Sequence, residues 1–167
     1  EKLFEKPVTE MIGYGSHPVP AGSWSDDTSM TLALIDSINN CCEIDYDDIM
    51  NNFCDWVNFA KYTPGDEVFD IGRTCLRAIS NYRRDKDINT CGLVGENYNG
   101  NGSLMRILPL VYYFHYKGIT DDNEIREITD IVSGLTHGHN ISKMACFMYV
   151  KYVLFLLNGM NKYDAYN

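Results

Sequence analysis

Residues 25–38 read SDDTSMTLALIDSI, and this stretch begins and continues as a helix does. Ser25 is a natural N-cap, because its hydroxyl oxygen can accept a hydrogen bond from a free backbone N–H of the first turn. Asp26 and Asp27 follow in that turn, where the helix dipole favours acidic side chains. Apolar residues then recur at three- to four-residue intervals on one face: Met30, Leu34, Ile35 and Ile38. The pattern predicts an amphipathic helix that ends near Asn39-Asn40.

The same helical period dominates the rest of the chain. It predicts further helices near residues 45–60, 70–82, 103–114, 121–135 and 141–157. Ser103 is expected to cap the helix that follows it, and Pro109 to kink or interrupt that helix. The helix over 141–157 is apolar almost all round, which favours a central position. Residues 9–14 and the vicinity of Val94 could form short strands. We expect an all-α fold, one compact multi-helix domain over residues 1–167.

Length and charge limit the classes of partner. The 167 residues suit one domain, since domains mostly have ~100–200 residues. A net charge of -9 argues against binding to nucleic acid or to an anionic membrane, because attraction to phosphate dominates such binding. We therefore expect neither partner, and a phosphate-bearing ligand would need a local device such as a helix N-terminus or a metal ion. The apolar run from Met144 to Leu157 is shorter than a ~20-residue membrane span and contains Lys151, so we expect a buried helix.

The cysteines give no sign of a disulfide framework or a zinc site. None of the six forms a C-x-x-C pair, and no Cys/His cluster has zinc-finger spacing. We expect reduced thiols in a cytoplasmic protein, and we recognise no signal peptide.

Ser25-Asp26-Asp27-Thr28 is the first candidate for chemistry. Two adjacent carboxylates between two hydroxyls supply the hard oxygen ligands that Mg²⁺ and Mn²⁺ prefer. The same tetrapeptide is also an ordinary helix start, and a helix N-terminus disfavours a cation. On these four residues alone, the plain helix start is the better explanation.

Asn99-Gly100-Asn101-Gly102-Ser103 is the second candidate. Gly and Asn let a ligand approach the backbone, and the helix expected behind them would offer free N–H groups to an anion. A glycine-rich N-cap loop without a ligand explains the pattern about as well. The pattern is not a Walker loop, because G-x-x-x-x-G-K-[ST] is absent.

Two further candidates are single residues. Asp70 could accept a ribose hydroxyl or act as a base, although a helix N-cap explains it equally well. His137 and His139 lie two residues apart between helices, but a third metal ligand at a familiar spacing is missing, so zinc is not expected. We expect His137 to make a single polar contact instead.

In their order along the chain, these motifs resemble those of the ADP-ribosylglycohydrolase family, which includes dinitrogenase reductase-activating glycohydrolase. The resemblance extends from Pro7 to about Leu157, and it depends on four motifs: residues 22–30 (GSWSDDTSM), 69–74 (FDIGRT), 99–106 (NGNGSLMR) and Thr136-His137.

The resemblance implies an all-α fold with two Mg²⁺ or Mn²⁺ ions in a cleft. It implies hydrolysis of the N- or O-glycosidic bond between ADP-ribose and a protein side chain or small leaving group, so that the partner is an ADP-ribosylated protein or a small ADP-ribose conjugate. The matching positions are Ser25, Asp26 and Asp27 as metal ligands, Asp70 as the catalytic acid near the ribose, and Asn99, Gly100, Asn101, Gly102, Ser103 and His137 at the substrate.

The chain departs from the family pattern at both ends. A Gly-Asp-Ala-x-Gly segment is expected upstream of Glu1, and nothing after Leu157 matches the Gly-Gly-Asp-Thr-Asp-Thr motif that supplies further metal ligands. Cys75 stands where a second Thr is common. We therefore expect a domain truncated at both ends. Two alternatives to the hydrolase remain: a non-catalytic module that binds ADP-ribose or a nucleotide, and a plain helical interaction domain.

Overall fold

The computed structural model describes residues 7–167, and it confirms the all-α fold in them. The α-helices are α2 (Asp26–Cys41), α3 (Tyr46–Phe59), α4 (Arg73–Asp85), α5 (Pro109–Lys117), α6 (Asp122–Gly134), α7 (Asn140–Leu157) and α8 (Lys162–Tyr166). Two short 3₁₀ helices, η1 (Glu96–Tyr98) and η2 (Leu104–Arg106), lie between α4 and α5. The strand considered over residues 9–14 is absent, and the one near Val94 reduces to an isolated parallel bridge between Leu93 and His137.

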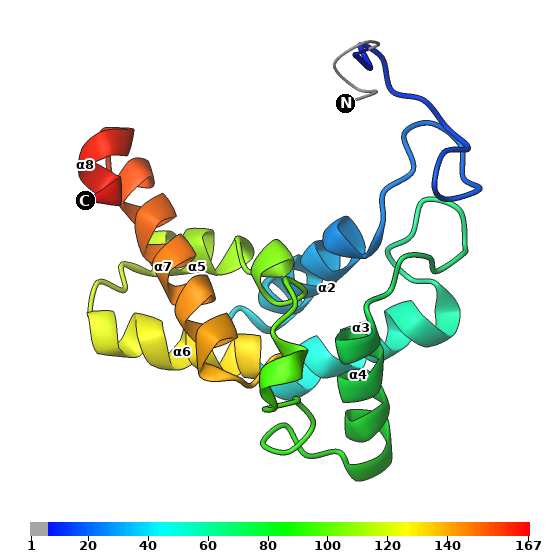
Figure 1. Cartoon of the computed structure of the whole chain (residues 1–167). Helices are drawn as coiled ribbons and strands as arrows, with labels where there is room; N and C mark the ends of the chain where they lie inside the picture. The colour runs from blue at the N-terminus through cyan, green and yellow to red at the C-terminus, as the bar shows by residue number, and fades with distance from the viewer. Residues whose placement is uncertain (1–6) are drawn as a thin grey trace.

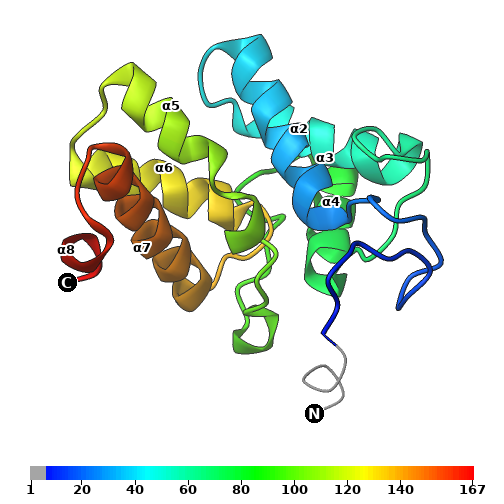
Figure 2. The ribbon, with the colours of Figure 1, turned by 90° about the horizontal axis from the view of Figure 1, so that it is seen from above.

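The helices form two groups. Figures 1 and 2 show α2, α3 and α4 on one side and α5 to α8 on the other, with the segment between α4 and α5 running between them. The 3₁₀ helix η2 contacts both groups, since it packs against α2 and against α7. A residue on η2 is therefore well placed to join the two halves of the core.

The sequence explains why α2 and α3 form where they do. Met30 and Leu34 are fully buried on α2, although Ile35, expected on the same face, is 38% exposed. The N-cap of α3 is Asp45, whose carboxylate accepts a hydrogen bond from the backbone N–H of Asp48. Phe53 and Trp56 then turn inward on the predicted face.

Two predicted helix starts are wrong. Asp70 does not begin or cap a helix, because α4 starts at Arg73 and its N-cap is Gly72. Ser103 makes no capping bond, because its backbone is already helical and only the 3₁₀ turn of η2 follows. The interruption expected at Pro109 is confirmed: the proline begins α5 at a position where its missing N–H costs nothing.

The central position predicted for the last helix is also wrong. Only a narrow stripe of α7 is buried, while Ile141 and Met148 are 60% and 63% exposed; the stripe is Ser142, Cys146, Val150 and Leu154. With 18 residues and a mean hydropathy of 1.3, α7 is long and apolar enough to cross a membrane by length and composition. It packs against α5, α6 and α8.

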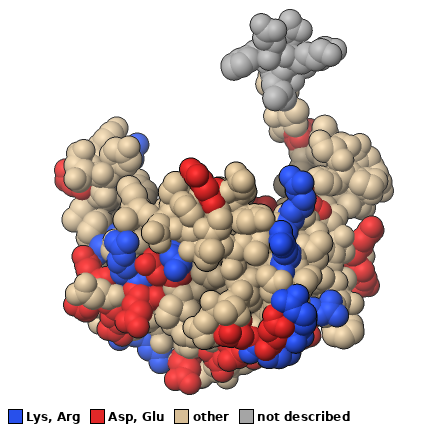
Figure 3. Space-filling view, turned by 60° about the horizontal axis from the view of Figure 1, so that its bottom comes forward, with Lys and Arg blue, Asp and Glu red and all other residues tan. Residues whose placement is uncertain are grey.

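Charges of both signs occur together on the face shown in Figure 3, where they surround a broad uncharged area. Basic side chains on this face are interspersed with acidic ones. A local arrangement of donors is therefore needed wherever an anionic ligand binds.

The core makes a prediction about stability. Phe53 is fully buried and Phe59, on the same helix, is 76% exposed. We expect Phe53→Ala to lower the free energy of unfolding by about 3–5 kcal/mol, and Phe59→Ala to change it by less than about 0.5 kcal/mol. Urea unfolding followed by circular dichroism measures both, and similar effects from the two substitutions would contradict this packing.

Candidate functional site

The N-terminus of α2 presents the Ser-Asp-Asp motif in an unusual way. Ser25 is the N-cap, yet its hydroxyl makes no capping bond and instead donates to the Asp27 carboxylate at 3.2 Å. Asp27 is exposed, whereas Asp26 is only 7% exposed. The Ser25 hydroxyl is therefore directed at a carboxylate and not at a backbone N–H of the helix.

Asp26 lies in a field of negative charge. Burial raises the pKa of its carboxyl group from 3.8 to about 6, and the neighbouring carboxylates of Asp27 and Asp70 add to the rise. No basic side chain contributes to this shift. A cation placed among these carboxylates would reverse it, because an opposite charge favours the ionised form.

Asp70 reaches this region from the loop before α4. Its backbone has a φ of 60°, in the left-handed region, which costs a non-glycine residue about 1–2 kcal/mol. Its carboxylate oxygen Oδ2 lies 3.4 Å from His17 Nε2, and the His17 ring packs against Phe69 at a tilt of 49°, with the centroids 5.3 Å apart. His17 is thus the neighbour that orients the Asp70 carboxylate, which remains 51% exposed.

A cavity of 520 Å³ connects these groups. Its lining includes Ser25, Asp27, Asp70 and His17, and apolar walls come from residues such as Trp24 and Phe69. The Trp24 indole N–H donates to the carbonyl of Tyr62 at 2.9 Å, which fixes that wall. Among residues 7–167, no group of three or more His, Cys, Asp and Glu side chains is close enough to hold a metal by itself.

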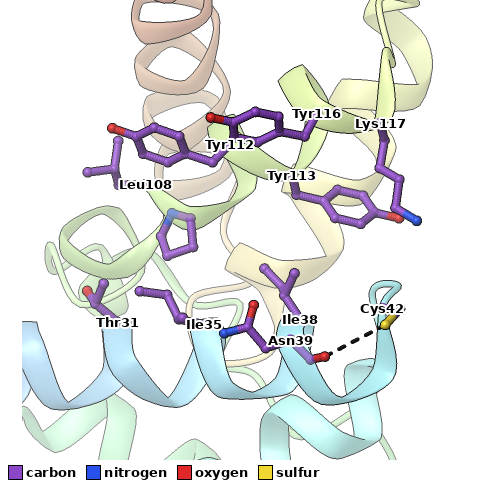
Figure 4. Close-up of a pocket in the computed structure, with 11 residues that line it drawn as sticks. Thr31, Ile35, Ile38, Asn39, Cys42, Leu108, Tyr112, Tyr113, Tyr116 and Lys117 are labelled. Atoms are coloured by element: carbon purple, nitrogen blue, oxygen red, sulfur yellow. Dashed lines mark hydrogen bonds between the residues drawn. The ribbon is translucent and has the colours of Figure 1, made fainter.

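A larger cavity of 740 Å³ lies between α2 and α5, and Figure 4 shows its lining. Tyrosines of α5, including Tyr112 and Tyr116, face Ile35 and Ile38 of α2 across it. Its lining residues include no carboxylate and none of the motif residues named above. For hydrolytic chemistry we therefore assign the smaller cavity.

The Asn99–Ser103 loop is held at both ends. The Asn99 side-chain amide lies 3.0 Å from His139 Nδ1 and accepts a hydrogen bond from Ser142 at 2.9 Å, which ties the loop to the start of α7. Ser103 is buried, and its hydroxyl accepts a hydrogen bond from Ser133 at 3.0 Å. Gly100 and Asn101 remain exposed between these anchors.

His137 lies beneath this loop. It is only 2% exposed, and burial lowers the pKa of its imidazole to about 4, with the positive charge of Arg106 adding to the effect. A Cβ added at Gly102 would lie 2.8 Å from His137 Cε1 and 2.7 Å from Cys75 Sγ, so glycine is required for this close approach.

Cys75 links the loop to the carboxylates. Burial raises the pKa of its thiol to about 11, and the nearby Asp26 carboxylate contributes to the rise. A Cβ at Gly102 would touch the thiol directly, and the Asp26 carboxylate is near enough to influence its ionisation. The glycine loop therefore lies over His137 and Cys75, while the start of α2 and the Asp70 loop line the smaller cavity.

The site also contains residues that the motif reading did not assign. Nothing in the sequence distinguished His17 from a surface histidine. Arg106, a fully buried residue, had one signal: it is a charged residue inside the apolar pattern that runs from Leu104 to Leu108.

Comparison with known proteins shows the family of the chain. A sequence model of the family described as ADP-ribosylglycohydrolase matches residues 1–167. The chain belongs to the ADP-ribosylglycohydrolase family. It is 27% identical over 158 residues to Tri1, an ADP-ribosylarginine hydrolase of Pseudomonas putida (strain GB-1). The matched region is 95% of this chain and 41% of that relative.

Two further relatives are similar over most of this chain. The ADP-ribosyl-[dinitrogen reductase] glycohydrolase of Rhodospirillum rubrum is 31% identical over 150 residues, or 90% of this chain and 47% of that protein. The Tri1 hydrolase of Serratia proteamaculans (strain 568) is 26% identical over 96% of this chain and 42% of its own length. The chain thus spans less than half the length of these three relatives.

The raised pKa of Asp26 leads to a prediction about how stability depends on pH. The pKa of Asp26 is about 6 in the folded state and 3.8 ordinarily, so the folded state binds the proton more tightly. The free energy of unfolding therefore falls as the pH rises from 3.8 to about 6. In metal-free buffer at pH 7.5, Asp26→Asn should therefore raise the free energy of unfolding by about 2 kcal/mol, a gain that disappears near pH 4. Urea unfolding at the two pH values measures the effect.

Asp66→Asn, at an exposed acid in the loop before Asp70, is the control and should leave stability nearly unchanged. An Asp26→Asn protein no more stable than the wild type at pH 7.5 would contradict the buried, repelled carboxylate.

Gly102 makes a second prediction at this site. Gly102→Ala forces its new methyl group into His137 and Cys75, so it should destabilise the fold by about 1–3 kcal/mol. Gly100→Ala is the matched control, because a Cβ there would meet only His137 Nε2 at 3.6 Å, an ordinary contact. Thermal unfolding compares the two, and equal melting temperatures would show that the loop does not rest on His137.

Proposed function

We propose that the protein releases ADP-ribose from modified arginine side chains with the help of Mg²⁺ or Mn²⁺. The observation that carries the proposal is the buried Asp26 carboxylate, repelled by Asp27 and Asp70 beside a cavity in a chain of this family. The names of the relatives support arginine as the leaving group, since two of them are ADP-ribosylarginine hydrolases. An ADP-ribosylated protein is the partner that follows, and a small ADP-ribose conjugate would fit the same chemistry.

The donor set suits a hard divalent cation. Ser25, Asp26 and Asp27 would hold it, because Mg²⁺ commonly takes one or two carboxylates and completes its shell with water and substrate oxygens. When bound, the ion would orient the ribose hydroxyls and make a water molecule more acidic. It would also offset the repulsion that raises the pKa of Asp26.

Asp70 is the group of this chain that fits acid–base work. In the reaction, the bond from the anomeric carbon to the guanidino nitrogen breaks, a bond to a water oxygen forms, and the leaving guanidine takes up a proton. The anomeric carbon becomes positively charged on the way. The Asp70 carboxylate, fixed by His17 at the cavity, would stabilise that charge, orient a ribose hydroxyl and accept the proton of the attacking water.

The diphosphate needs donors that an acidic protein does not offer over its surface. The exposed backbone at Gly100 and Asn101 would supply them, because glycine-rich turns let N–H groups approach an anion. Asn99 and Ser103 would fix the ends of that turn rather than hold the ligand, since their side chains are engaged with α6 and α7.

The test is an assay of the purified protein on ADP-ribosylarginine, ADP-ribosylserine and an ADP-ribosyl ester. We expect release of ADP-ribose from arginine when Mg²⁺ or Mn²⁺ is present, and none after chelation. Asp26→Asn/Asp27→Asn should lower kcat/KM by about 100-fold or more, since a metal site supplies several kcal/mol of transition-state stabilisation.

Asp47→Asn/Asp48→Asn is the matched control, because this acidic pair also lies in the first turn of a helix, one residue further along α3, and outside the cavity. Full activity in chelator, or in the Asp26/Asp27 variant, would overturn the metal-assisted mechanism. Binding of ADP-ribose without metal and without release would instead favour the non-catalytic module.

A further inference from the structure

Arg106 occupies a costly position. It is fully buried on η2, and no carboxylate among residues 7–167 lies within ion-pair distance of it. Both terminal nitrogens donate to the carbonyl of Val132 at 3.3 Å, and the guanidinium lies 4.9 Å from the centre of the Phe53 ring. Its Nε has no partner in the described part of the chain. Replacing a buried charge with a well-packed apolar side chain often leaves the protein as stable or more stable. Stability therefore does not explain an arginine at this position, and a specific geometric role explains it better.

Hydrogen bonds connect Arg106 to His137 through Thr136. Arg106 Nη2 donates to Thr136 Oγ1 at 2.7 Å, and the same oxygen lies 2.9 Å from His137 Nδ1. The backbone of this segment is fixed as well, because Leu93 N–H donates to the carbonyl of Thr136 at 3.0 Å and His137 N–H to that of Ser133 at 2.9 Å. The imidazole is thus held through its Nδ1 edge.

The other edge of the imidazole faces the loop. Cβ atoms built at Gly100 and Gly102 would lie 3.6 Å and 3.3 Å from His137 Nε2, so the ring supports the loop backbone from below. Because the ring is almost completely covered, its route to a ligand is through this backbone. The contacts form one chain from Phe53 through Arg106, Thr136 and His137 to the glycines.

We propose that Arg106 is a positioning residue: through Thr136 it fixes the His137 imidazole as a rigid support beneath the Asn99–Ser103 loop, and so sets the shape of the loop that meets the ligand. The effect on the ligand depends on the function proposed above. The orientation of the ring does not depend on it, so the two can fail separately.

The test uses Thr136→Val, which keeps the shape of the side chain and removes the hydroxyl, with Thr136→Ser as the matched variant that retains it. Long-range ¹H–¹⁵N spectra of the histidine rings should show a single neutral tautomer of His137 in the wild type and in Thr136→Ser. A hydrogen bond at Nδ1 selects one tautomer, so Thr136→Val should give a mixture.

Kinetics supply the second readout. A misplaced loop weakens binding of substrate and transition state alike, so Thr136→Val should raise KM about tenfold or more with kcat nearly unchanged. Simple destabilisation would instead lower apparent kcat at constant KM, because fewer molecules are folded. Thr136→Ser should restore the wild-type KM.

Unchanged His137 spectra and KM in Thr136→Val, a loss of kcat alone, or an equal rise of KM in Thr136→Ser would each overturn the proposal. If Thr136→Val does not fold, the wild-type spectrum decides, because exchange between two tautomers contradicts a fixed ring. If the wild type releases no ADP-ribose from any substrate, the proposed function fails while the spectra still test the support.

Discussion

The guanidinium of Arg106 is enclosed where the two groups of helices meet. Its ring partner, Phe53, belongs to α3 of the first group, and its carbonyl partner, Val132, belongs to α6 of the second. Removing a partner from a buried charge costs several kcal/mol, so this contact restrains both groups at once. The Asn99–Ser103 loop runs into η2 immediately before Arg106, and its position therefore follows from how that one side chain is held.

The second constraint is electrostatic and lies at the start of α2. Buried acids are normally paired with a cation, yet Asp26 is buried beside two further carboxylates, and hydrogen bonding from Ser25 and from the Asp27 backbone offsets only part of the rise in its pKa. Asp70 adds a backbone strain that a glycine or a different turn would relieve. Local rules broken together in one small region are typical of a functional site, where stability is given up for chemistry.

Much of the fold could be predicted from the sequence, because the helical period depends only on local spacing. Asp45 and Asp121 were expected at helix starts and are N-caps, and Pro109 interrupts its helix as its missing N–H requires. The errors concern tertiary context. The exposure of Ile35 and of one face of α7 depends on which helices lie opposite, and the periodicity of a single helix does not contain that information.

The sequence motifs indicated candidate residues, but they did not predict which side chains contact one another. No sequence pattern pairs His17 with Asp70, because 53 positions separate them and neither belongs to a helix. The roles of Cys75 and Arg106 likewise depend on long-range packing. The proposed roles of Ser25, Asp26, Asp27 and Asp70 stay predictions, because they depend on a metal and a substrate.

The central claim is that Asp26 and Asp27 at the start of α2 hold a cation beside the Asp70 carboxylate, where ADP-ribose binds. The most direct test is a crystal of the protein grown with Mn²⁺ and ADP-ribose, measured at a wavelength at which manganese scatters anomalously. We expect a manganese peak about 2.0–2.3 Å from oxygens of Asp26 or Asp27, with the ribose directed at Asp70 and the diphosphate along Gly100 and Asn101. ADP-ribose bound in the groove between α2 and α5, with no manganese at Asp26 or Asp27, would contradict the account.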